Sequence, residues 1–297
     1  MLTLAALTAL ATAHEGSLGK PVGPLLIGDR TFDVDRAPVI MGTVNLSRDS
    51  TYRDSIAVST ESAIRKARVM AAQGADFVDI GAESSTARAS RVGVHDQINA
   101  LVPVVEQLTD DNIAVSTETY EPEVVRACFK AGARVLNLTG SEHHEAIYDL
   151  AAEHDATVIL CYVKGANVRE ISDVALEEDP LPGLLAHFEK RVEVARAHGV
   201  QRLVIDPGMG FFYGNLIDPL TRVQHQTQVL LNTFRLRSLG LPICHAMPHA
   251  FDLFEDQFRI AEGFFSVLAF LGGTSVYRTH EVANVSAVLK AMSTLEV

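Results

Sequence analysis

PVIMGTVNLSRDS, residues 38–50, combines the two features that determine the fold. Residues 38–44 are mostly apolar, which is typical of a β-strand that is buried on both faces. Asn45 ends the apolar run, and the chain becomes polar from Ser47 onward. This order predicts a buried strand whose carboxyl end opens into a polar loop.

Seven further runs of the same kind follow, separated by longer stretches in which apolar residues recur every three or four positions. Two such stretches are TESAIRKARVMAAQG and EPEVVRACFKAG, in which Gly74 and Gly132 sit where helices usually end. The eight predicted strands are PVIMGTVN (38–45), DFVDIG (76–81), IAVSTE (113–118), RVLNLT (134–139), TVILCY (157–162), RLVID (202–206), LPICHA (241–246) and TSVYRT (274–279).

This alternation predicts an α/β fold built on a parallel sheet. An open doubly wound sheet also satisfies the alternation, but eight units with similar spacing favour closure into a (β/α)8 TIM barrel. No GxGxxG sequence follows the first strand, as a dinucleotide-binding sheet would have. We predict a single barrel over residues 38–297. Residues 1–37 are expected to form an N-terminal helix and, at 22–36, a hairpin that closes the barrel bottom.

The first residues, MLTLAALTALATAHEG, contain an apolar run like that of a secretory signal peptide, but its first lysine comes only at Lys20. A signal peptide normally begins with basic residues, so a short helix is favoured. Cys128, Cys161 and Cys244 lie far apart and form no CxxC pair, which speaks against a zinc cluster or a disulfide framework. We therefore expect a cytoplasmic protein with reduced thiols.

Composition limits the possible partners. Hydrophobic residues make up 47% and charged residues 21% of the 297 positions, and no apolar run reaches the roughly 18 residues of a spanning helix. The net charge of −12 disfavours a nucleic-acid partner, because such partners require a basic surface. A small anionic substrate remains compatible with this charge, since a local cationic pocket can oppose the global charge.

Polar residues gather where the predicted strands end. In a closed barrel the carboxyl ends of all strands open onto one rim, which is where barrel enzymes carry out their chemistry. The sequence therefore predicts an active site at that rim. Its candidate residues are Asn45, Glu83, Glu118, Asn137, Asp206, His245 and Arg278.

These strand-end sequences resemble those of one known family, the dihydropteroate synthases. The matches occur in the family's order and extend over residues 38–297. They are IMGTVNLSRDS (40–50), GADFVDIGAESS (74–85), STETY (116–120), NLTG (137–140), DPGMGF (206–211) and YRTHEV (277–282). Six collinear matches at strand ends are a specific signal, although any one alone is weak.

The resemblance implies a transferase of folate biosynthesis. In that reaction the amine of para-aminobenzoate displaces pyrophosphate from a hydroxymethyl-dihydropterin diphosphate, and Mg²⁺ assists the leaving group. A pterin ring is a flat array of donors and acceptors, so its pocket needs carboxylate and amide groups. A departing pyrophosphate accumulates negative charge, so it needs arginine, histidine, a metal or helix-terminal amides.

The family's motifs assign roles to individual residues. By resemblance, Asn45 helps to hold the Mg²⁺ and the diphosphate. Arg278 and His280 match the family's final anion site, for which a planar guanidinium is well suited. We predict these three residues to be catalytic, with Asn45 also the metal ligand.

The pterin contacts are predicted in the same way. Glu118 stands where the family has an aspartate that contacts the pterin, and it is one methylene longer. Asn137 and Asp206 match the asparagine and aspartate that bond the pterin edge. In the second loop, Ser85 and Arg88 are candidate substrate contacts, although Arg88 comes one or two positions later than the family's arginine.

The seventh strand departs from the family. Its serine-arginine-lysine motif, whose lysine bonds the pterin, is replaced by HAMPHAFDLF (245–254), with His249 and Ala250 in place of the arginine and lysine. His249 is the remaining candidate donor there. This loss favours a divergent paralogue and leaves open a homologue without synthase activity, acting as a binder or regulator or on a different small molecule. A pterin-dependent methyltransferase is disfavoured, because a methyl donor needs no diphosphate site.

Two further expectations concern metals and assembly. His245, His249 and His280 on one rim, together with Asp206, could bind a transition metal, but the absence of HxH and HExxH spacing disfavours a dedicated site. The resemblance implies a homodimer, because barrels of that family commonly pair through their last helices. The apolar stretches EGFFSVLAFLGG (262–273) and VSAVLKAMSTL (285–295) fit this expectation.

Overall fold

The computed structural model describes residues 1–47, 56–84, 91–163, 177–209 and 218–296. Within them, eight parallel strands form one sheet in the order β8-β7-β6-β5-β4-β3-β10-β9. An isolated parallel bridge between Ile205 and Ile243 joins the two edge strands, which closes the sheet into a barrel. The strands are β3 (Val39–Asn45), β4 (Phe77–Gly81), β5 (Val115–Glu118), β6 (Val135–Leu138), β7 (Thr157–Cys161), β8 (Leu203–Asp206), β9 (Cys244–Ala246) and β10 (Val276–Thr279).

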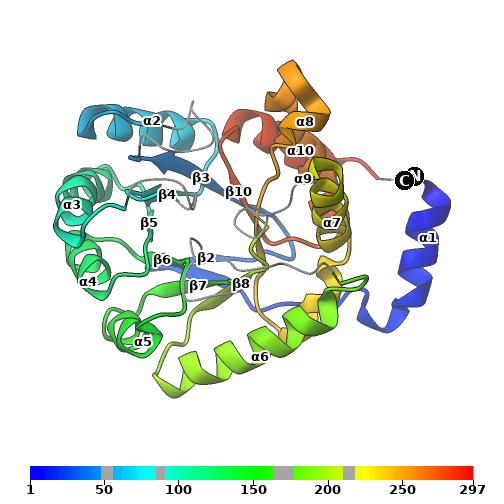
Figure 1. The fold of residues 1–297 in the computed structure, drawn as a ribbon, viewed down its shortest axis with the longest axis horizontal. Coiled ribbons are helices and arrows are strands. Elements are labelled where there is room, and N and C mark those ends of the chain that lie inside the picture. Colours follow the sequence, from blue (N-terminus) through cyan, green and yellow to red (C-terminus); the bar gives the residue numbers. More distant parts are fainter. Residues whose placement is uncertain (48–55, 85–90, 164–176, 210–217, 297) are drawn as a thin grey trace.

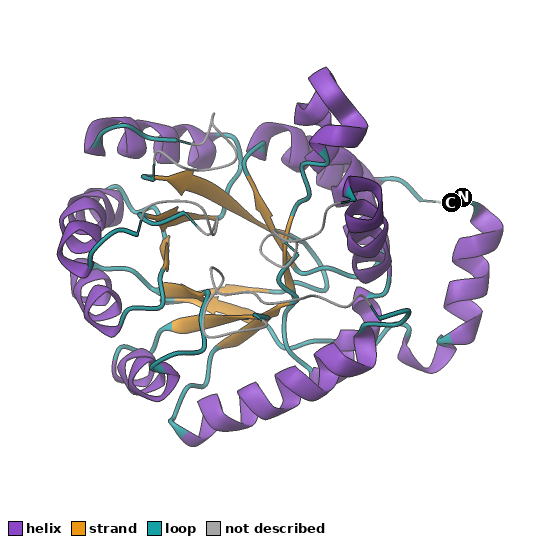
Figure 2. Ribbon diagram, in the orientation of Figure 1, coloured by secondary structure: helices purple, strands orange, loops and turns teal. Residues whose placement is uncertain are grey.

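Helices surround this barrel, as Figures 1 and 2 show, with the strands inside and the helices outside. One main helix follows each barrel strand, so the predicted (β/α)8 architecture is confirmed. The α-helices are α1 (Leu4–Ala13), α2 (Thr60–Ala72), α3 (Val94–Asp110), α4 (Pro122–Ala131), α5 (His144–Glu153), α6 (Leu181–Ala197), α7 (Pro219–Leu231), α8 (Phe251–Phe254), α9 (Ala261–Leu271) and α10 (Val282–Thr294). The 3-10 turns are η1 (Glu15–Ser17), η3 (Thr233–Leu239) and η4 (Glu255–Ile260).

The strands divide their side chains between two hydrophobic clusters. In β7, Val158 and Leu160 belong to the large cluster between sheet and helices, whereas Ile159 and Cys161 belong to the cluster inside the barrel. All five residues of this strand are buried. Because successive side chains of a strand point to opposite faces, this division fixes which residues face the barrel interior.

An antiparallel hairpin packs on the barrel interior. It is formed by β1 (Leu25–Ile27) and β2 (Arg30–Phe32), in register from Leu25↔Phe32 to Ile27↔Arg30. Leu25 and Ile27 join the interior cluster, and Thr157 at the start of β7 donates a hydrogen bond to the carbonyl of Leu26. The division of the chain into two parts at residue 38 stays a prediction.

The helix ends predicted from glycines are confirmed. Gly132 caps α4 with a φ of 116°, and Gly74 follows α2 with a φ of 109°. A Cβ atom on Gly132 would also lie 2.6 Å from Oγ1 of Thr109, so both conformation and space require glycine. Within the described ranges, no helix combines the length and apolarity needed to traverse a lipid bilayer.

Candidate active site

Five of the predicted rim residues share one face of the sheet. Phe77, Val135, Val204 and Val276 lie in the interior cluster. Positions two residues further along each strand must also point inward. These positions are Asp79, Asn137, Asp206 and Arg278, and by the same alternation Asn45 and Glu118 face inward on β3 and β5. The barrel therefore brings together, near the carboxyl ends of its strands, polar residues that are far apart in sequence.

Arg278 lies between two carboxylates. Its Nε donates to Oδ2 of Asp79 at 2.9 Å, and its Nη2 donates to Oε2 of Glu118 at 2.5 Å. The Arg278 side chain is 10% exposed, and both carboxylates are buried or nearly so. A guanidinium has five N–H groups, so these two bonds leave donors with which Arg278 can also contact an anion.

Asp79 connects Arg278 to Asn137. The amide nitrogen of Asn137 donates to Oδ2 of Asp79 at 3.0 Å, and Ser116 donates to Oδ1 of Asp79 at 2.7 Å. The thiol of Cys161 in turn donates to Oδ1 of Asn137 at 3.1 Å. Both ends of the Asn137 amide are therefore engaged within the protein, although each end can take part in a second hydrogen bond.

Asp206 ends β8 and shapes the turn that follows. Its Oδ1 accepts a hydrogen bond from the backbone N–H of Gly208 at 2.7 Å, a local bond that aspartate commonly makes. Gly208 has a φ of 76°, and a Cβ atom there would lie 2.3 Å from the carbonyl oxygen of Tyr162. The Asp-Pro-Gly sequence thus forms a tight turn, and the same carboxylate remains at the strand end.

Burial changes the protonation of the two carboxyl groups that are candidates for ring contact. Loss of hydration raises the pKa of Glu118 to about 7, and Arg278 opposes this rise. Burial likewise raises the pKa of Asp206 to about 6, against the effect of the Gly208 hydrogen bond. Near neutral pH these groups can therefore exchange between a proton-donating and a proton-accepting form.

A pocket beside Glu118 is lined by residues of the neighbouring strand ends, among them Glu83, Thr119 and Tyr120. The Tyr120 hydroxyl donates to Oε2 of Glu83 at 2.6 Å. Oε1 of Glu83 accepts from the backbone N–H of Val92 at 2.9 Å. These bonds hold the wall of the pocket in one arrangement.

His249 and His280 meet at a third buried acid. Nδ1 of each imidazole lies 3.1 Å from Oε1 of Glu262, and the two ring centres are 4.9 Å apart. Burial lowers the pKa of His280, against the opposing effect of Glu262. The structure thus brings together His280, predicted to be catalytic, and His249, predicted to contact the substrate, and it places both against a carboxylate.

His245 does not open onto the rim, so that expectation was wrong. Its neighbour Cys244 faces the barrel interior, and the alternation of β9 turns His245 outward. There it is fully buried and its Nε2 lies 2.8 Å from the hydroxyl of Thr233. Burial lowers its pKa to about 3, which keeps the imidazole neutral. The three-histidine rim cluster considered from the sequence does not form.

Two predicted contacts cannot be placed. Ser85 and Arg88 lie outside the described residues. Asn45 ends β3 opposite Gly81 of β4, and its backbone carbonyl accepts from Ala57 at 2.7 Å. Asn45 is therefore at the strand end where it was predicted.

Asp79 and Glu262 were not predicted from the sequence. Asp79 is a single acid within the apolar strand FVDIG, and Glu262 is a single acid in the apolar helix AEGFFSVLAFL. Both are fully buried. A lone carboxylate in an apolar element was the available signal, because such groups are rarely buried without partners.

The rim can be tested for its fit to Mg²⁺. This ion prefers oxygen ligands and is usually held by one or two protein groups together with phosphates of a substrate. Asn45 offers an amide oxygen at a strand end, which fits that donor set. The pair His249 and His280 offers imidazole nitrogens, which fit Mg²⁺ poorly.

A family model and a known relative both match this chain. A family model described as "Pterin binding enzyme" matches residues 41–280. The dihydropteroate synthase of Synechocystis sp. is 26% identical over 284 residues, covering 92% of this chain and 95% of the relative.

Two solved structures share the fold. Xanthomonas albilineans dihydropteroate synthase with 4-aminobenzoic acid is 26% identical with a TM-score of 0.76, covering 93% of this chain and 100% of the relative. Thermus thermophilus dihydropteroate synthase in complex with 6HMPPP is 25% identical with a TM-score of 0.73, covering 92% of this chain and 100% of the relative. The chain therefore belongs to the pterin binding enzyme family, the family of the dihydropteroate synthases.

Proposed function

We propose that this protein is a transferase of the dihydropteroate synthase type, which joins a dihydropterin-CH2-diphosphate to an amine such as para-aminobenzoate and releases pyrophosphate. One observation carries the proposal: Glu118, Asp206 and Arg278 point into the barrel near the strand ends, where Arg278 donates a hydrogen bond to Glu118. That arrangement offers hydrogen-bonding groups for a flat polar ring beside a cation for an anionic leaving group.

The pterin end of the proposed site is formed by Glu118, Asn137 and Asp206. Each carboxyl group can accept from a ring N–H when ionised and can donate when protonated, and the raised pKa values make both forms accessible near pH 7. Asn137 is held by Asp79 and Cys161, so its amide plane is fixed before a ligand arrives. Such fixed groups favour binding because less freedom is lost on complex formation.

The diphosphate end is formed by Asn45, Arg278 and His280. Mg²⁺, held by Asn45 and the phosphates, would neutralise part of the charge on the leaving group. Arg278 is positioned by Asp79 and Glu118, and its remaining N–H donors can contact phosphate oxygens. His280 has a lowered pKa, so it acts at neutral pH as a polar hydrogen-bonding group more than as a cation.

The acceptor amine binds, in this proposal, near the loop that has lost the family's lysine. The Xanthomonas relative was solved with 4-aminobenzoic acid, which supports an arylamine acceptor. His249, next to the position of the lost lysine, is expected to serve there as a weaker hydrogen-bonding group, and its Nδ1 lies 3.1 Å from Oε1 of Glu262. We expect Ser85 and Arg88 to contribute substrate contacts from the second loop.

Release of pyrophosphate tests the proposal. The protein should release pyrophosphate from a dihydropterin-CH2-diphosphate in the presence of Mg²⁺, and para-aminobenzoate should stimulate the release. Asp206→Asn should lower kcat/KM, whereas His95→Ala, which changes an exposed imidazole on α3, should leave it unchanged. No acceptor-dependent release from folded protein would contradict synthase activity.

A strain that lacks its own synthase separates this function from that of a non-catalytic binder. Growth without added folate products is expected if the protein is a synthase. Failure to grow, together with binding of the pterin in vitro, would instead support a binder or an enzyme with another acceptor.

We further propose that the protein is a cytoplasmic homodimer. Phe264 and Leu271 on α9 are 44% and 54% exposed, and Ile260 just before this helix is 53% exposed. Such a patch of large apolar side chains favours a partner surface.

The proposed compartment and the proposed assembly are supported separately. Each of the three cysteines is a buried free thiol, which is compatible with a reducing compartment. Sedimentation that finds only a 32.1 kDa species at micromolar concentration would contradict the dimer.

A further inference from the structure

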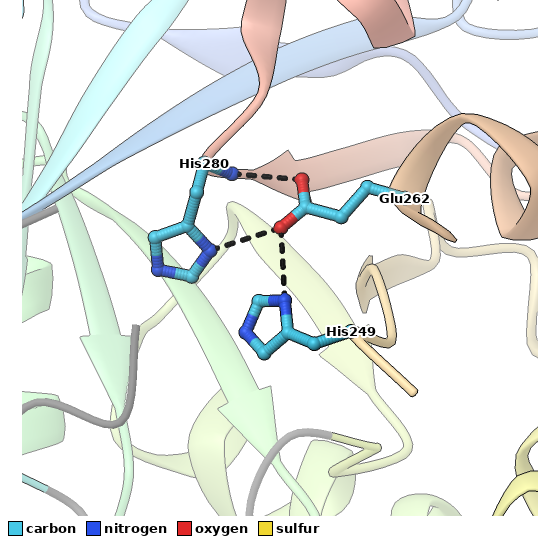
Figure 3. A group of neighbouring side chains, drawn as sticks. All are labelled: His249, Glu262 and His280. Atoms are coloured by element: carbon cyan, nitrogen blue, oxygen red, sulfur yellow. Dashed lines mark hydrogen bonds and ion pairs between the residues drawn. The ribbon is translucent and has the colours of Figure 1, made fainter. Parts of the chain in front are cut away.

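Three segments of the chain bring two imidazoles and one carboxylate together at one side of the rim. His249 comes from the loop after β9, Glu262 from the first turn of α9, and His280 from the residue after β10. Figure 3 shows both imidazoles directed at the same carboxylate oxygen. Each residue offers one ligand atom, and these three atoms all lie within 4.8 Å of one another.

The Glu262 carboxylate is held in position by its other oxygen. Oε2 accepts hydrogen bonds from the backbone N–H groups of His280 and Glu281 at 2.9 and 3.1 Å, and from the hydroxyl of Thr279. Oε1 is thereby directed at the two imidazoles. Outer hydrogen bonds of this kind orient the ligands of metal sites and are a regular part of their construction.

The spacing of the donor atoms fits a small coordination sphere. Nδ1 of His249 and Nδ1 of His280 each lie 3.1 Å from Oε1 of Glu262. In a tetrahedral zinc site with bonds of roughly 2.0–2.1 Å, neighbouring ligand atoms are about 3.3–3.4 Å apart. The two nitrogen–oxygen distances are therefore close to those of such a site. All three ligand atoms lie within 4.8 Å of one another, so the two imidazoles would move toward each other to bind one ion. Each imidazole would then carry its proton on Nε2.

Burial and charge favour a cation at this place. The Glu262 side chain is 1% exposed, whereas the side chains of His249 and His280 are 21% and 12% exposed. Burial alone would raise the pKa of Glu262, but the contacts with the two histidines hold it well below its usual range. The cluster is thus an ionised carboxylate with two imidazoles, and its more exposed side leaves a route for an ion and a fourth ligand.

We propose that His249, Glu262 and His280 bind one transition-metal dication of the zinc class, with a fourth coordination position open to water. Two imidazoles and one carboxylate are a donor set that suits zinc and similar metals better than Mg²⁺ or Ca²⁺. This site is separate from the Mg²⁺ expected at Asn45. It does not rest on the proposed function, because metal binding can be measured without pterin or acceptor.

Zinc content after equilibrium dialysis is the first test. The full chain is first freed of metal with a chelator and then dialysed against micromolar zinc in the presence of excess Mg²⁺. It should retain about one equivalent of zinc per chain. His249→Ala, His280→Ala and Glu262→Gln should each weaken zinc binding by about 100-fold or more, since even an outer ligand is worth 10–100-fold. His95→Ala provides the matched control, because this histidine is exposed on α3, and it should bind zinc like the parent protein.

Cobalt binding and crystallography identify the ligands directly. Co²⁺ bound at this site should give the visible absorption of a four-coordinate ion, and zinc-soaked crystals should show an anomalous peak between Nδ1 of His249, Nδ1 of His280 and Oε1 of Glu262. An anomalous peak elsewhere, no retained zinc, or full binding by the two histidine variants would overturn the proposal. The soaked parent crystal decides the question even if Glu262→Gln fails to fold.

Discussion

Replacing Arg278 by methionine should lower the free energy of unfolding by about 3–5 kcal/mol at pH 8. This is the usual loss when one partner of a buried ion pair is removed, because the other partner stays buried without compensation. Here the remaining partners are two carboxylates, Asp79 and Glu118, at 2.9 and 2.5 Å from the guanidinium. If Arg278 were instead an exposed arginine on the rim, its replacement would lower the free energy of unfolding by no more than about 1 kcal/mol.

The loss should shrink as the pH is lowered. In the parent protein the folded-state pKa of Glu118 is raised to about 7, so at pH 8 the carboxyl is mostly ionised, and below pH 7 the folded state holds a proton there that the unfolded state has released. Without Arg278 the pKa of Glu118 rises further, and protonation removes part of the uncompensated charge. The difference between parent and variant should therefore fall between pH 8 and pH 6, by up to about 1.4 kcal/mol per unit for each proton taken up.

Urea unfolding of both proteins at pH 8 and pH 6 measures this effect. Arg259→Met is the matched control: Arg259 pairs with Glu281 at 2.9 Å, but its side chain is 55% exposed, so its loss should cost at most about 1 kcal/mol at both pH values. Equal losses of unfolding free energy for the two variants, or a loss for Arg278→Met that does not change with pH, would contradict the role of Arg278 as the buried partner of Asp79 and Glu118.

Three further predictions follow from the same contacts. Asp206→Asn keeps an acceptor for the Gly208 N–H but loses the ionised form, so calorimetry should show weaker pterin binding by about 1–3 kcal/mol with little change in stability. Gly208→Ala should lower the free energy of unfolding by about 1–3 kcal/mol in urea titrations, and by more than Gly240→Ala, because both glycines have positive φ but Gly240 has open space where a Cβ would lie. The parent protein should lose stability in urea as the pH falls from 6.5 to 5, since three fully or partly buried histidines stay neutral when folded and take up protons when unfolded. The raised carboxyl pKa values of Glu118 and Asp206 offset about two of these three protons. Those histidines, whose pKa values burial lowers to about 4, 4 and 3, are His187, His225 and His245. Unchanged binding, equal losses for the two glycine variants, or a gain of stability on acidification would each contradict the corresponding step.

The barrel was predictable from the sequence because each strand is buried on both faces and therefore forms a compact apolar run. A residue at the carboxyl end of a barrel strand faces either the interior or the helices. Asn137, Asp206 and Arg278 were predicted to face the interior, and they do. His245 shows the limit of that argument. In the three-residue strand β9, a shift of one position turns a side chain from the rim to the helix layer.

The partners of these residues were not predictable. Asp79 pairs with Arg278 across 199 positions of sequence, and Glu262 joins His280 across 18. Neither acid belongs to a local pattern, so the sequence contains no spacing that would reveal the contact. The Arg278 ion pairs and the His249–Glu262–His280 cluster arise because closure of the barrel brings β10 beside both β3 and β9.

Calorimetric titration of the protein with a dihydropterin-CH2-diphosphate and Mg²⁺ is the sharpest test of whether this rim binds the proposed substrate. One ligand should bind per chain, and binding should be weakened by Asp206→Asn through the ring and by Arg278→Lys chiefly through the diphosphate. Because Arg278 also bonds Glu118, pterin without its diphosphate should lose some affinity in Arg278→Lys, but less than the diphosphate form does. No heat at millimolar ligand, with protein shown to be folded, would contradict the assignment of this rim as a pterin diphosphate site.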